Sequence, residues 1–231
     1  MTGGAKRVGR AIALELARAG VDVTITYRQS ADEAVETVDA IEQLGRRGFA
    51  VECNVRSEDS VRTAIASVMA EHGRLDILVN NAGVFQSVPL FEITLEQWDE
   101  VFETNARGPF LVSREALPHL RASAGRIIHL GSLGGMRAWA SHAHYCASKA
   151  ALHMLTQAQA KAFAPEVAVN CVAPGFIEID EQDEDGAHFA HKTPMRRNGT
   201  AEDVARAVLF FATAPEFITG QILTVDGGLG L

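Results

Sequence analysis

Thr2-Gly3-Gly4-Ala5-Lys6-Arg7-Val8-Gly9 opens the 231-residue chain and runs directly into a helical pattern. Within residues 9–19, Ile12 and Leu16 lie four positions apart, and Gly20 is typical of a helix end. Glycines let a backbone approach a pyrophosphate closely, and the free N–H groups of a helix N-terminus attract anions. The stretch therefore predicts a phosphate-holding loop before a helix, with a flexible glycine turn as the alternative.

Beyond this loop, apolar runs that predict strands alternate with helical patterns. The predicted strands are residues 21–27, 49–53, 75–79, 126–130, 167–171 and 221–225. The predicted helices are residues 31–44, 57–72, 143–162 and 201–212, with a long helix beginning at residue 95. Strands separated by helices require right-handed crossovers. The pattern therefore predicts an α/β fold in one domain over residues 1–231, a Rossmann-type doubly wound parallel sheet with helices on both faces.

Three local signals refine these helices. Ser57 is a predicted N-cap, and Thr94 with Gln97 fits a capping box at the start of the long helix. Gly108-Pro109 should bend or break that helix, because proline cannot donate a backbone hydrogen bond.

Composition excludes several classes of protein. Hydrophobic residues make up 47% of the chain, enough for a full core, but no apolar run approaches the roughly 18 residues of a membrane span. No signal-peptide pattern opens the chain, which predicts a cytoplasmic protein. The net charge of −8 argues against nucleic acid as a partner. Cys53, Cys146 and Cys171 are odd in number and read as reduced thiols, with no disulfide framework and no metal site.

A second stretch, Tyr145-Cys146-Ala147-Ser148-Lys149, carries residues suited to proton transfer. A tyrosine and a lysine four apart lie on one helix face, and the ammonium should lower the tyrosine pKa from its usual value near ~10. Ser132 follows the predicted strand 126–130, which places its hydroxyl at a strand end, where open α/β sheets hold their active sites. The alternative is an ordinary helix in which the tyrosine and lysine are incidental; the spacing to Ser132 argues against it.

Six motifs in one order, from residue 2 to residue 228, resemble the short-chain dehydrogenase/reductase family. They are the loop of residues 2–9, Asn80-Asn81-Ala82-Gly83, Asn105, the set Ser132/Tyr145/Lys149, Pro174-Gly175 and Asp226-Gly227-Gly228. Each motif alone is weak, and their joint order and spacing make the resemblance specific.

The resemblance implies a role for each catalytic residue. Tyr145 would protonate the substrate as hydride arrives from a nicotinamide, and Lys149 would lower the pKa of Tyr145 and hold the nicotinamide ribose. Ser132 would hydrogen-bond the polarised carbonyl. Asn105 would position a water that links Lys149 to bulk solvent; its alternative is a helix residue satisfied by its own backbone. The implied cofactor-binding residues are Gly3, Lys6, Arg7, Val8, Arg28, Ser30, Asn54, Val55, Asn81, Ala82, Gly83, Tyr145, Lys149, Pro174 and Gly175.

The residues after strand 21–27 indicate which nicotinamide cofactor is used. A carboxylate there would bind the ribose hydroxyls and repel a 2′-phosphate, but the chain has Tyr27-Arg28-Gln29-Ser30. Arg28 can pair with a phosphate, Ser30 can donate a hydrogen bond, and Lys6 and Arg7 add positive charge. NADP(H) is therefore the predicted cofactor; the alternative is that Arg28 is an ordinary solvated arginine.

Within the family, the glycine loop, the pair Tyr27-Arg28 and the phrase Ala164-Pro165-Glu166-Val167 look most like the pteridine-reductase branch. That resemblance implies reduction of a carbonyl or C=N group, possibly of a pterin-like heterocycle. A 3-oxoacyl or general carbonyl reductase is one alternative, and a non-catalytic NADP(H)-binding sensor is another.

The segment from Glu178 to Asp185 holds six carboxylates and is expected to form a substrate lid within about residues 176–195. Its alternative is a solvated acidic loop. A negative lid would be a poor partner for an acidic acyl-carrier protein or a CoA thioester. The expected partners are thus a small-molecule substrate and, by resemblance, further copies of the chain in a homodimer or homotetramer packed through the helices at residues 95 and 143–162.

The family begins with an apolar strand before the glycine loop, yet only Met1 precedes Thr2 in this sequence. That first strand would be central, between strands 21–27 and 75–79, so the sheet is expected to lack it, with unpaired backbone groups on both neighbours and nothing to aim the loop. We therefore expect an upstream strand of about 5–6 residues in the natural protein. Two alternatives are open: the flanking strands close the gap, or a partner segment fills it.

Overall fold

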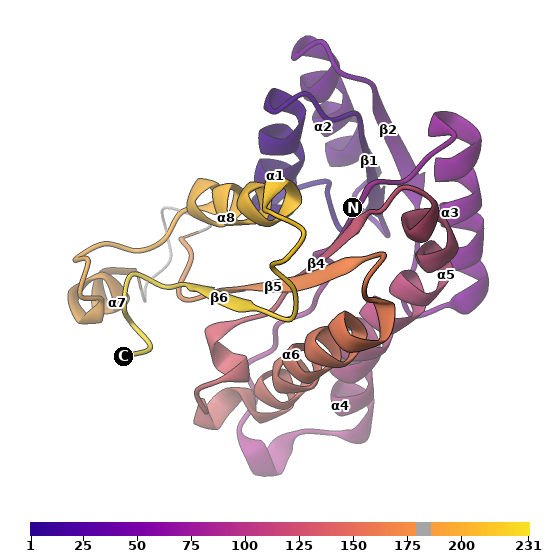
Figure 1. Ribbon diagram of the computed structural model, residues 1–231. Coiled ribbons are helices and arrows are strands. Elements are labelled where there is room, and N and C mark those ends of the chain that lie inside the picture. The colour runs from indigo at the N-terminus through magenta and orange to yellow at the C-terminus, as the bar shows by residue number, and fades with distance from the viewer. Residues whose placement is uncertain (179–185) are drawn as a thin grey trace.

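The computed structural model describes residues 1–178 and 186–231, in which helices and strands alternate along the chain (Figure 1). Its strands are β1 Val23–Tyr27, β2 Gly48–Glu52, β3 Ile77–Asn80, β4 Arg126–Leu130, β5 Ala168–Pro174 and β6 Ile222–Val225. Its α-helices are α1 Arg7–Arg18, α2 Ala31–Gln43, α3 Glu58–His72, α4 Leu95–Phe102, α5 Gly108–Ala122, α6 Ala143–Phe163, α7 Gly186–Lys192 and α8 Ala201–Thr213. Every predicted strand and helix is present, and α7 is an addition. Residues 179–185, which hold most of the acidic stretch of the expected lid, lie outside the described residues.

The predicted caps are confirmed. The Ser57 hydroxyl accepts a hydrogen bond from the Ser60 N–H at 3.3 Å. At the start of α4, the Thr94 hydroxyl accepts from the Gln97 N–H and the Gln97 side chain accepts from the Thr94 N–H, which is the reciprocal capping box. Local sequence thus sets where these helices begin.

Helices cover both faces of the parallel strands, as predicted. On one face, α1 and α8 lie side by side in Figure 1 and share a core with α2 that includes Ile12, Ile25 and Val208. On the other face, α3, α5 and α6 cover a second core that includes Leu120 and Ile127. Parallel strands buried on both faces explain why their sequences are apolar runs rather than alternating patterns.

Gly108-Pro109 does not break the long helix, but the helix is irregular just before it. Between α4 and α5 the chain makes a π-helical turn, Glu103–Arg107, in which the Gly108 N–H donates to the Glu103 carbonyl five residues back. Pro109 then lies in the first turn of α5, where a helix tolerates a missing N–H. The backbone stays helical because the π turn absorbs the irregularity.

The strands form two sheets rather than one, β1–β2 and β3–β4–β5–β6, all paired in parallel. Only Met1 and Thr2 lie between β1 and β3. The Thr26 N–H donates to the Met1 carbonyl at 2.9 Å, and the Thr2 N–H donates to the Val79 carbonyl at 2.9 Å. The expected central position of a first strand is therefore confirmed, and the alternative in which β1 and β3 close the gap is wrong.

The cysteines lie apart from one another in the fold and form no disulfide among the described residues. All three cysteines are free, with Cys53 and Cys171 buried. Among the described residues, no cluster of histidine, cysteine and acidic side chains is suited to a metal ion. No helix within residues 1–178 and 186–231 is both long and apolar enough to cross a bilayer.

Candidate active site

The glycine loop lies at the carboxyl ends of the strands and is built by close backbone contact. Gly3 has a φ of 64°, in the left-handed region that glycine adopts without strain, and its carbonyl accepts a hydrogen bond from Asn81 Nδ2 at 2.7 Å. A Cβ placed on Gly9 would lie 2.0 Å from the Gly3 carbonyl oxygen, so any larger residue would push α1 off the loop. These two glycines keep the N-terminus of α1 against the loop.

Thr2 fastens this loop to the end of β3. Its hydroxyl accepts hydrogen bonds from the backbone N–H groups of Asn81 and Ala82, both at 3.0 Å, while the Gly4 N–H donates to the Thr26 carbonyl. We expected the loop to lose its aim without a complete strand before it. It keeps its place because these cross-strand hydrogen bonds replace the missing support.

The N-terminus of α1 leaves backbone N–H groups available as hydrogen-bond donors. Its N-cap, Lys6, makes no side-chain capping bond, so the first N–H groups of the helix have no side-chain acceptor there. Lys6 instead pairs with Glu33 at 3.3 Å, and Arg7, with a φ of 53°, is exposed. The macrodipole and free N–H groups at this point suit an anion.

Arg28 and Ser30 lie just past β1, on the same edge. Arg28 is exposed, and Ser30 is the N-cap of α2, where its side chain makes no capping bond to the helix backbone. After β2, the Asn54 side chain accepts from the Arg56 N–H at 3.1 Å, and Val55 is buried against Gly108. Asn54 and Val55 therefore sit at the next strand end, adjacent to the π turn.

At the catalytic centre, Ser132 follows β4 and caps a short 3₁₀ turn, Leu133–Gly135. Its hydroxyl accepts from the Gly134 N–H at 3.0 Å. A hydrogen bond with Ser132 favours the Tyr145 phenolate, but burial raises the tyrosine pKa more strongly, so the net shift is upward. The expected lowering of the Tyr145 pKa is thus not what this geometry produces.

Lys149 does not offset this effect of burial on the Tyr145 pKa. Its Nζ lies 5.8 Å from the centre of the Tyr145 ring and donates to the Leu130 carbonyl at 2.7 Å. Complete burial lowers the Lys149 pKa to about 8, so the group is still mostly protonated at neutral pH and loses its charge only above it. Lys149 is therefore a buried ammonium that lies beside the tyrosine ring and donates to the backbone of β4.

Asn105 lies inside the π turn and is fully buried. Its amide accepts from the Val84 N–H at 2.8 Å, and donates to the Val84 carbonyl at 2.9 Å and to the Ser148 hydroxyl at 3.1 Å. The alternative of a helix residue satisfied by its own backbone is therefore wrong: the partners come from the loop after β3 and from α6. Because Pro109 has no N–H, the Asn105 carbonyl receives no α-helical bond from four residues on.

Gly83 lies between Asn105 and Lys149. A Cβ there would be 3.2 Å from Asn105 Oδ1 and 3.7 Å from Lys149 Nζ. On the far side, Pro174 ends β5 and the Gly175 N–H donates to the Val225 carbonyl, with Asp226 holding the following turn through the Gly228 and Gly230 N–H groups. The predicted residues thus converge at the carboxyl edge of the strands, from β1 to β6.

Two features of the site were not predicted. His153 Nε2 accepts the Ser132 backbone N–H at 3.4 Å, and burial lowers its pKa to about 4, so the imidazole is neutral and able to accept. His153 is four residues after Lys149, and the same helical spacing that paired Tyr145 with Lys149 would have placed it on this face.

The second feature is a group of aromatic side chains around Tyr145. Phe85 stacks on His142 with ring centres 4.6 Å apart and meets Tyr145 edge-on at 4.8 Å. The Trp139 ring is nearly parallel to the Tyr145 ring, at 6.2 Å. Their separation in sequence gave no signal of this arrangement, an aromatic wall around the Tyr145 ring in which the planes of Trp139 and His142 meet at 84°.

Known proteins match this chain over nearly its whole length. A family model described as enoyl-(acyl carrier protein) reductase matches residues 3–230. The 3-oxoacyl-[acyl-carrier-protein] reductase FabG of Staphylococcus aureus is 37% identical over 236 residues, covering 99% of this chain and 96% of the relative. The 3-oxoacyl-[acyl-carrier-protein] reductase of Synechocystis sp. is also 37% identical, over 234 residues, with 99% and 95% covered.

Solved structures agree with the fold. Acetoin dehydrogenase YohF from Salmonella typhimurium superposes with a TM-score of 0.90 at 30% identity, covering 99% of this chain and 94% of that chain. A mutant of a Serratia marcescens short-chain dehydrogenase/reductase superposes with a TM-score of 0.93 at 32% identity, covering 100% and 96%. The chain is therefore an oxidoreductase that belongs to the short-chain dehydrogenase/reductase family.

Proposed function

We propose that this protein uses NADPH to reduce the carbonyl of a 3-oxoacyl compound, with Tyr145 as the proton donor. The observation that carries the proposal is the convergence of Ser132, Tyr145, Lys149 and Asn105 beside Gly83, at the end of the strands where the glycine loop also lies. Such an edge is where open α/β sheets bind their ligands.

The residues present fit a dinucleotide phosphate. The uncapped N-terminus of α1 and the tight Gly3–Gly9 contact form a cradle for a pyrophosphate. Exposed Arg28, with Ser30 beside it and no carboxylate between them, fits the 2′-phosphate of NADPH rather than a free ribose hydroxyl. When bound, the nicotinamide would supply hydride; orienting the substrate and moving protons are left to the protein.

The protein itself donates a proton to the substrate oxygen and then restores that proton to the donor. The Ser132 hydroxyl, which accepts from Gly134 and hydrogen-bonds with Tyr145, can turn its proton toward a substrate carbonyl oxygen that lies between them. The raised pKa of Tyr145 keeps the phenol protonated at neutral pH, which suits it to donate its proton as the oxygen gains charge. Lys149, with a pKa of about 8, exchanges protons readily near neutral pH and can return one to Tyr145.

Asn105 acts in this relay through its backbone. Its side-chain amide is occupied by Val84 and Ser148, so a relay water would bind the carbonyl that Pro109 leaves without its α-helical donor. Asn105 would thereby link Lys149 to solvent, as the family resemblance implies.

The choice of substrate rests on the relatives and on the aromatic wall. The 3-oxoacyl reductases named above support the 3-oxoacyl reading better than the pterin reading. A pterin-like heterocycle is the second candidate, because Trp139 and Phe85 each offer an aromatic face on which a planar ring can stack. Neither the named reductases nor the aromatic wall favours a protein that binds NADPH without turning over a substrate.

The test is NADPH oxidation with three probes: acetoacetyl-N-acetylcysteamine, acetoacetyl-CoA and 7,8-dihydrobiopterin. We expect turnover with a 3-oxoacyl thioester, and with the neutral one in preference to the CoA ester, since the chain carries a net charge of −8. Turnover of dihydrobiopterin alone would reverse the order of the two candidates. Tight NADPH binding with no turnover of any probe would contradict a reductase and favour the sensor.

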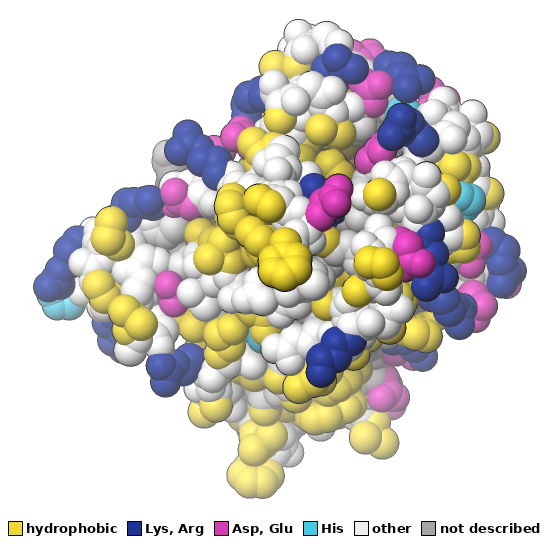
Figure 2. All heavy atoms as spheres, viewed as in Figure 1, with side chains coloured by type: hydrophobic (Ala, Val, Ile, Leu, Met, Phe, Trp, Pro, Cys, Tyr) yellow, Lys and Arg dark blue, Asp and Glu magenta, His cyan; other side chains and the backbone are white. Residues whose placement is uncertain are grey.

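We also propose that the protein assembles as a homodimer or homotetramer. Apolar side chains gather in the lower part of Figure 2, around α4, where Phe91 is 99% exposed and Leu95 is 78% exposed. Elsewhere on the visible face, basic and acidic side chains are interspersed rather than gathered into one basic surface. Light scattering at micromolar concentration should give a multiple of 24.8 kDa; a monomer would contradict the proposal.

A further inference from the structure

His153 is a side chain of α6 to which the proposed mechanism gives no task, although it is only 6% exposed. It lies one helical turn after Lys149 and two turns after Tyr145, on the same side of the helix. α6 packs against β5 (Figure 1) and against the 3₁₀ turn Leu133–Gly135, which follows Ser132. The imidazole is therefore enclosed between the helix and the turn that carries the serine.

Two glycines leave the space that the imidazole fills. A Cβ on Gly135 would lie 2.6 Å from His153 Cε1 and 2.8 Å from Nδ1, and a Cβ on Gly131 would overlap Nε2. Neither glycine has a φ in the left-handed region, so the ring, rather than the backbone conformation, excludes larger residues at these two positions. The backbone from Gly131 to Gly135, with Ser132 inside it, thus packs directly on the ring.

The hydrogen bond between His153 and Ser132 has one possible direction. The Ser132 backbone N–H lies 3.4 Å from His153 Nε2. A backbone N–H can only donate, so Nε2 carries no proton and the ring proton is on Nδ1. Burial, and after it the charge of Lys149, lowers the His153 pKa to about 4. The imidazole is therefore a neutral acceptor at neutral pH.

With this bond, each polar atom of Ser132 has a partner. Its carbonyl accepts from the Gly135 N–H at 2.9 Å, and its hydroxyl accepts from the Gly134 N–H at 3.0 Å and hydrogen-bonds with Tyr145. The two glycine donors belong to the turn that follows the serine, so they move with it. The bond to His153 instead joins the serine backbone to α6, the helix that carries Tyr145. It therefore fixes the serine relative to the tyrosine.

We propose that His153 is a positioning residue for the reduction. By accepting the Ser132 N–H, it holds the serine backbone against α6 and so aims the hydroxyl at the carbonyl oxygen that Tyr145 protonates. The role assigned to His153 rests on the proposed function, in which Ser132 binds the substrate carbonyl. A ring that only filled the space beside the glycines would need the right shape, whereas a positioning residue needs an acceptor atom.

The test uses variants that separate the acceptor from the shape of the side chain. His153→Gln carries an amide oxygen at about the reach of Nε2, and His153→Met has the same length but ends there in a methyl group. His153→Asn ends nearer the place of Nδ1, so it is a second variant without an acceptor for Ser132, should the methionine protein not fold. Gln43→Met, at an exposed position of α2, is the matched control for exchanging an amide and a methyl group.

We expect kcat of the methionine and asparagine variants to fall about 3- to 10-fold, the cost of one hydrogen bond, while KM for NADPH changes less than about twofold. Kinetics with the best 3-oxoacyl probe measures both constants. His153→Gln should keep kcat within about twofold of the original, and Gln43→Met should leave it unchanged. In a Ser132→Ala background, His153→Met should cause no further loss of kcat, because the hydroxyl that it misplaces is gone.

Two kinetic results would overturn the proposal. Equal kcat in the glutamine and methionine variants would show that the acceptor atom has no effect on turnover. An undiminished loss from His153→Met in the Ser132→Ala background would show that the histidine acts without the serine hydroxyl.

A measurement that needs no turnover separates this inference from the proposed function. NMR of tyrosine labelled at Cζ reports on the surroundings of the Tyr145 hydroxyl, and Tyr27 is the only other tyrosine in the sequence. The Tyr145 signal should shift in His153→Met and in Ser132→Ala, and keep its position in His153→Gln. Such shifts in a protein that oxidises NADPH with none of the three probes would contradict the proposed function alone. An unmoved signal in His153→Met would overturn the positioning role, even in a protein that turns over a 3-oxoacyl probe.

Discussion

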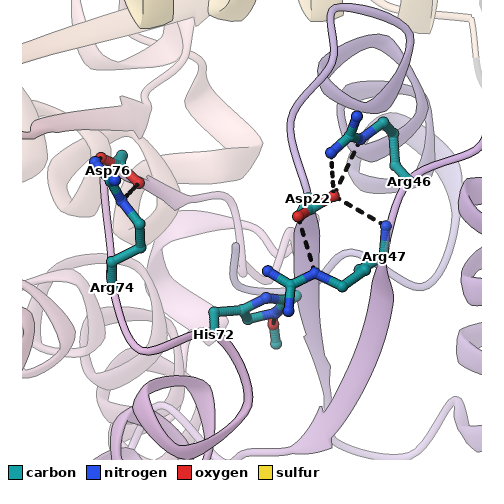
Figure 3. A network of polar contacts seen from close by, with 7 residues as sticks. Asp22, Arg46, Arg47, His72, Arg74 and Asp76 are labelled. Carbon is teal, nitrogen blue, oxygen red and sulfur yellow. Dashed lines mark hydrogen bonds and ion pairs between the residues drawn. The ribbon is translucent and has the colours of Figure 1, made fainter.

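The carboxyl ends and the amino ends of β1 and β3 use their polar groups in opposite ways. At the carboxyl ends, hydrogen bonds between segments hold two loops: Asn81 and Ala82 donate to the Thr2 hydroxyl of the glycine loop, and Val84 after β3 donates to the Asn105 side chain. At the amino ends, a cavity of about 350 Å³, which we call the slot, lies between β1 and β3, and the ion pairs of Asp22 with Arg47 and of Arg74 with Asp76 lie at its mouth (Figure 3). The polar groups at the carboxyl ends thus hold loops in place, whereas those at the amino ends border a cavity.

The difference shows which contacts a catalytic edge needs. Its residues are held by bonds between loops that follow the strands, so their geometry does not require the strands to be paired along their full length. Stability has a different source, since a central strand removes many polar groups and apolar faces from water at once. We therefore expect changes at the catalytic edge to alter turnover, and changes at the slot to alter stability.

The sharpest test of this division is Tyr145→Phe. It should leave the fold and NADPH binding intact and lower kcat by about 10²–10⁴, the range for loss of a positioned general acid. Steady-state kinetics with the best 3-oxoacyl probe measures the effect. Arg74→Ala at the mouth of the slot is the matched control and should change kcat less than about twofold. Near-normal turnover in Tyr145→Phe would refute the assigned mechanism.

Arg28→Asp should invert the cofactor preference. It removes the partner of the 2′-phosphate and adds a repulsive carboxylate, which should cost NADPH about 10- to 100-fold in kcat/KM while NADH improves. Arg206→Asp, on the exposed side of α8, makes the same change of charge elsewhere and should leave the preference unchanged. Equal use of NADH and NADPH by the original protein would show that the end of β1 does not select the cofactor.

Acid should destabilise the protein through His129, which lies beneath the catalytic edge in β4. Burial lowers its pKa from 6.5 to about 4, while a hydrogen bond with Gln159 opposes the shift. The unfolded chain thus binds a proton at a higher pH than the folded one. Stability is complete above pH 6.5 and falls by roughly 3 kcal/mol as the pH drops through 6.5 toward 4.

Urea unfolding from about pH 7 to about pH 4.5 measures this loss. His129→Gln should lower stability at pH 7 but flatten its dependence on pH, whereas His191→Gln, at an exposed position in α7, should leave the slope unchanged. An unchanged slope in His129→Gln would assign the acid sensitivity to other groups.

The smallest effect is expected at the mouth of the slot. Asp22→Asn weakens the pairs with Arg46 and Arg47, but these groups are solvent-screened, so the melting temperature should fall by a few degrees at most. Thermal unfolding at low and high salt measures the change, which should shrink further in high salt. A large loss of stability would show that the mouth, and not the apolar walls, holds the two sheets together.

The sequence alone determined the order of elements, the parallel sheet, the helix caps and the identity of the residues at the carboxyl edge. These follow from short-range rules: Thr94 with Gln97 caps its own helix, and Tyr145 and Lys149 share a face because of helical spacing. Because parallel strands end at one edge, motifs more than a hundred residues apart could be assigned to one site.

Only the tertiary structure decided the direction of the pKa shifts at Tyr145 and Lys149 and the division of the strands into two sheets. Burial, which no local pattern reports, raises the pKa of Tyr145 and lowers that of Lys149, opposite to the simple pairing expected from their spacing. Contacts between distant segments also form the hydrogen bonds from Thr2 that hold the glycine loop, the aromatic wall around Tyr145, and the slot. Desolvation and packing arise when all the elements meet, so they could not be predicted from any one stretch of sequence.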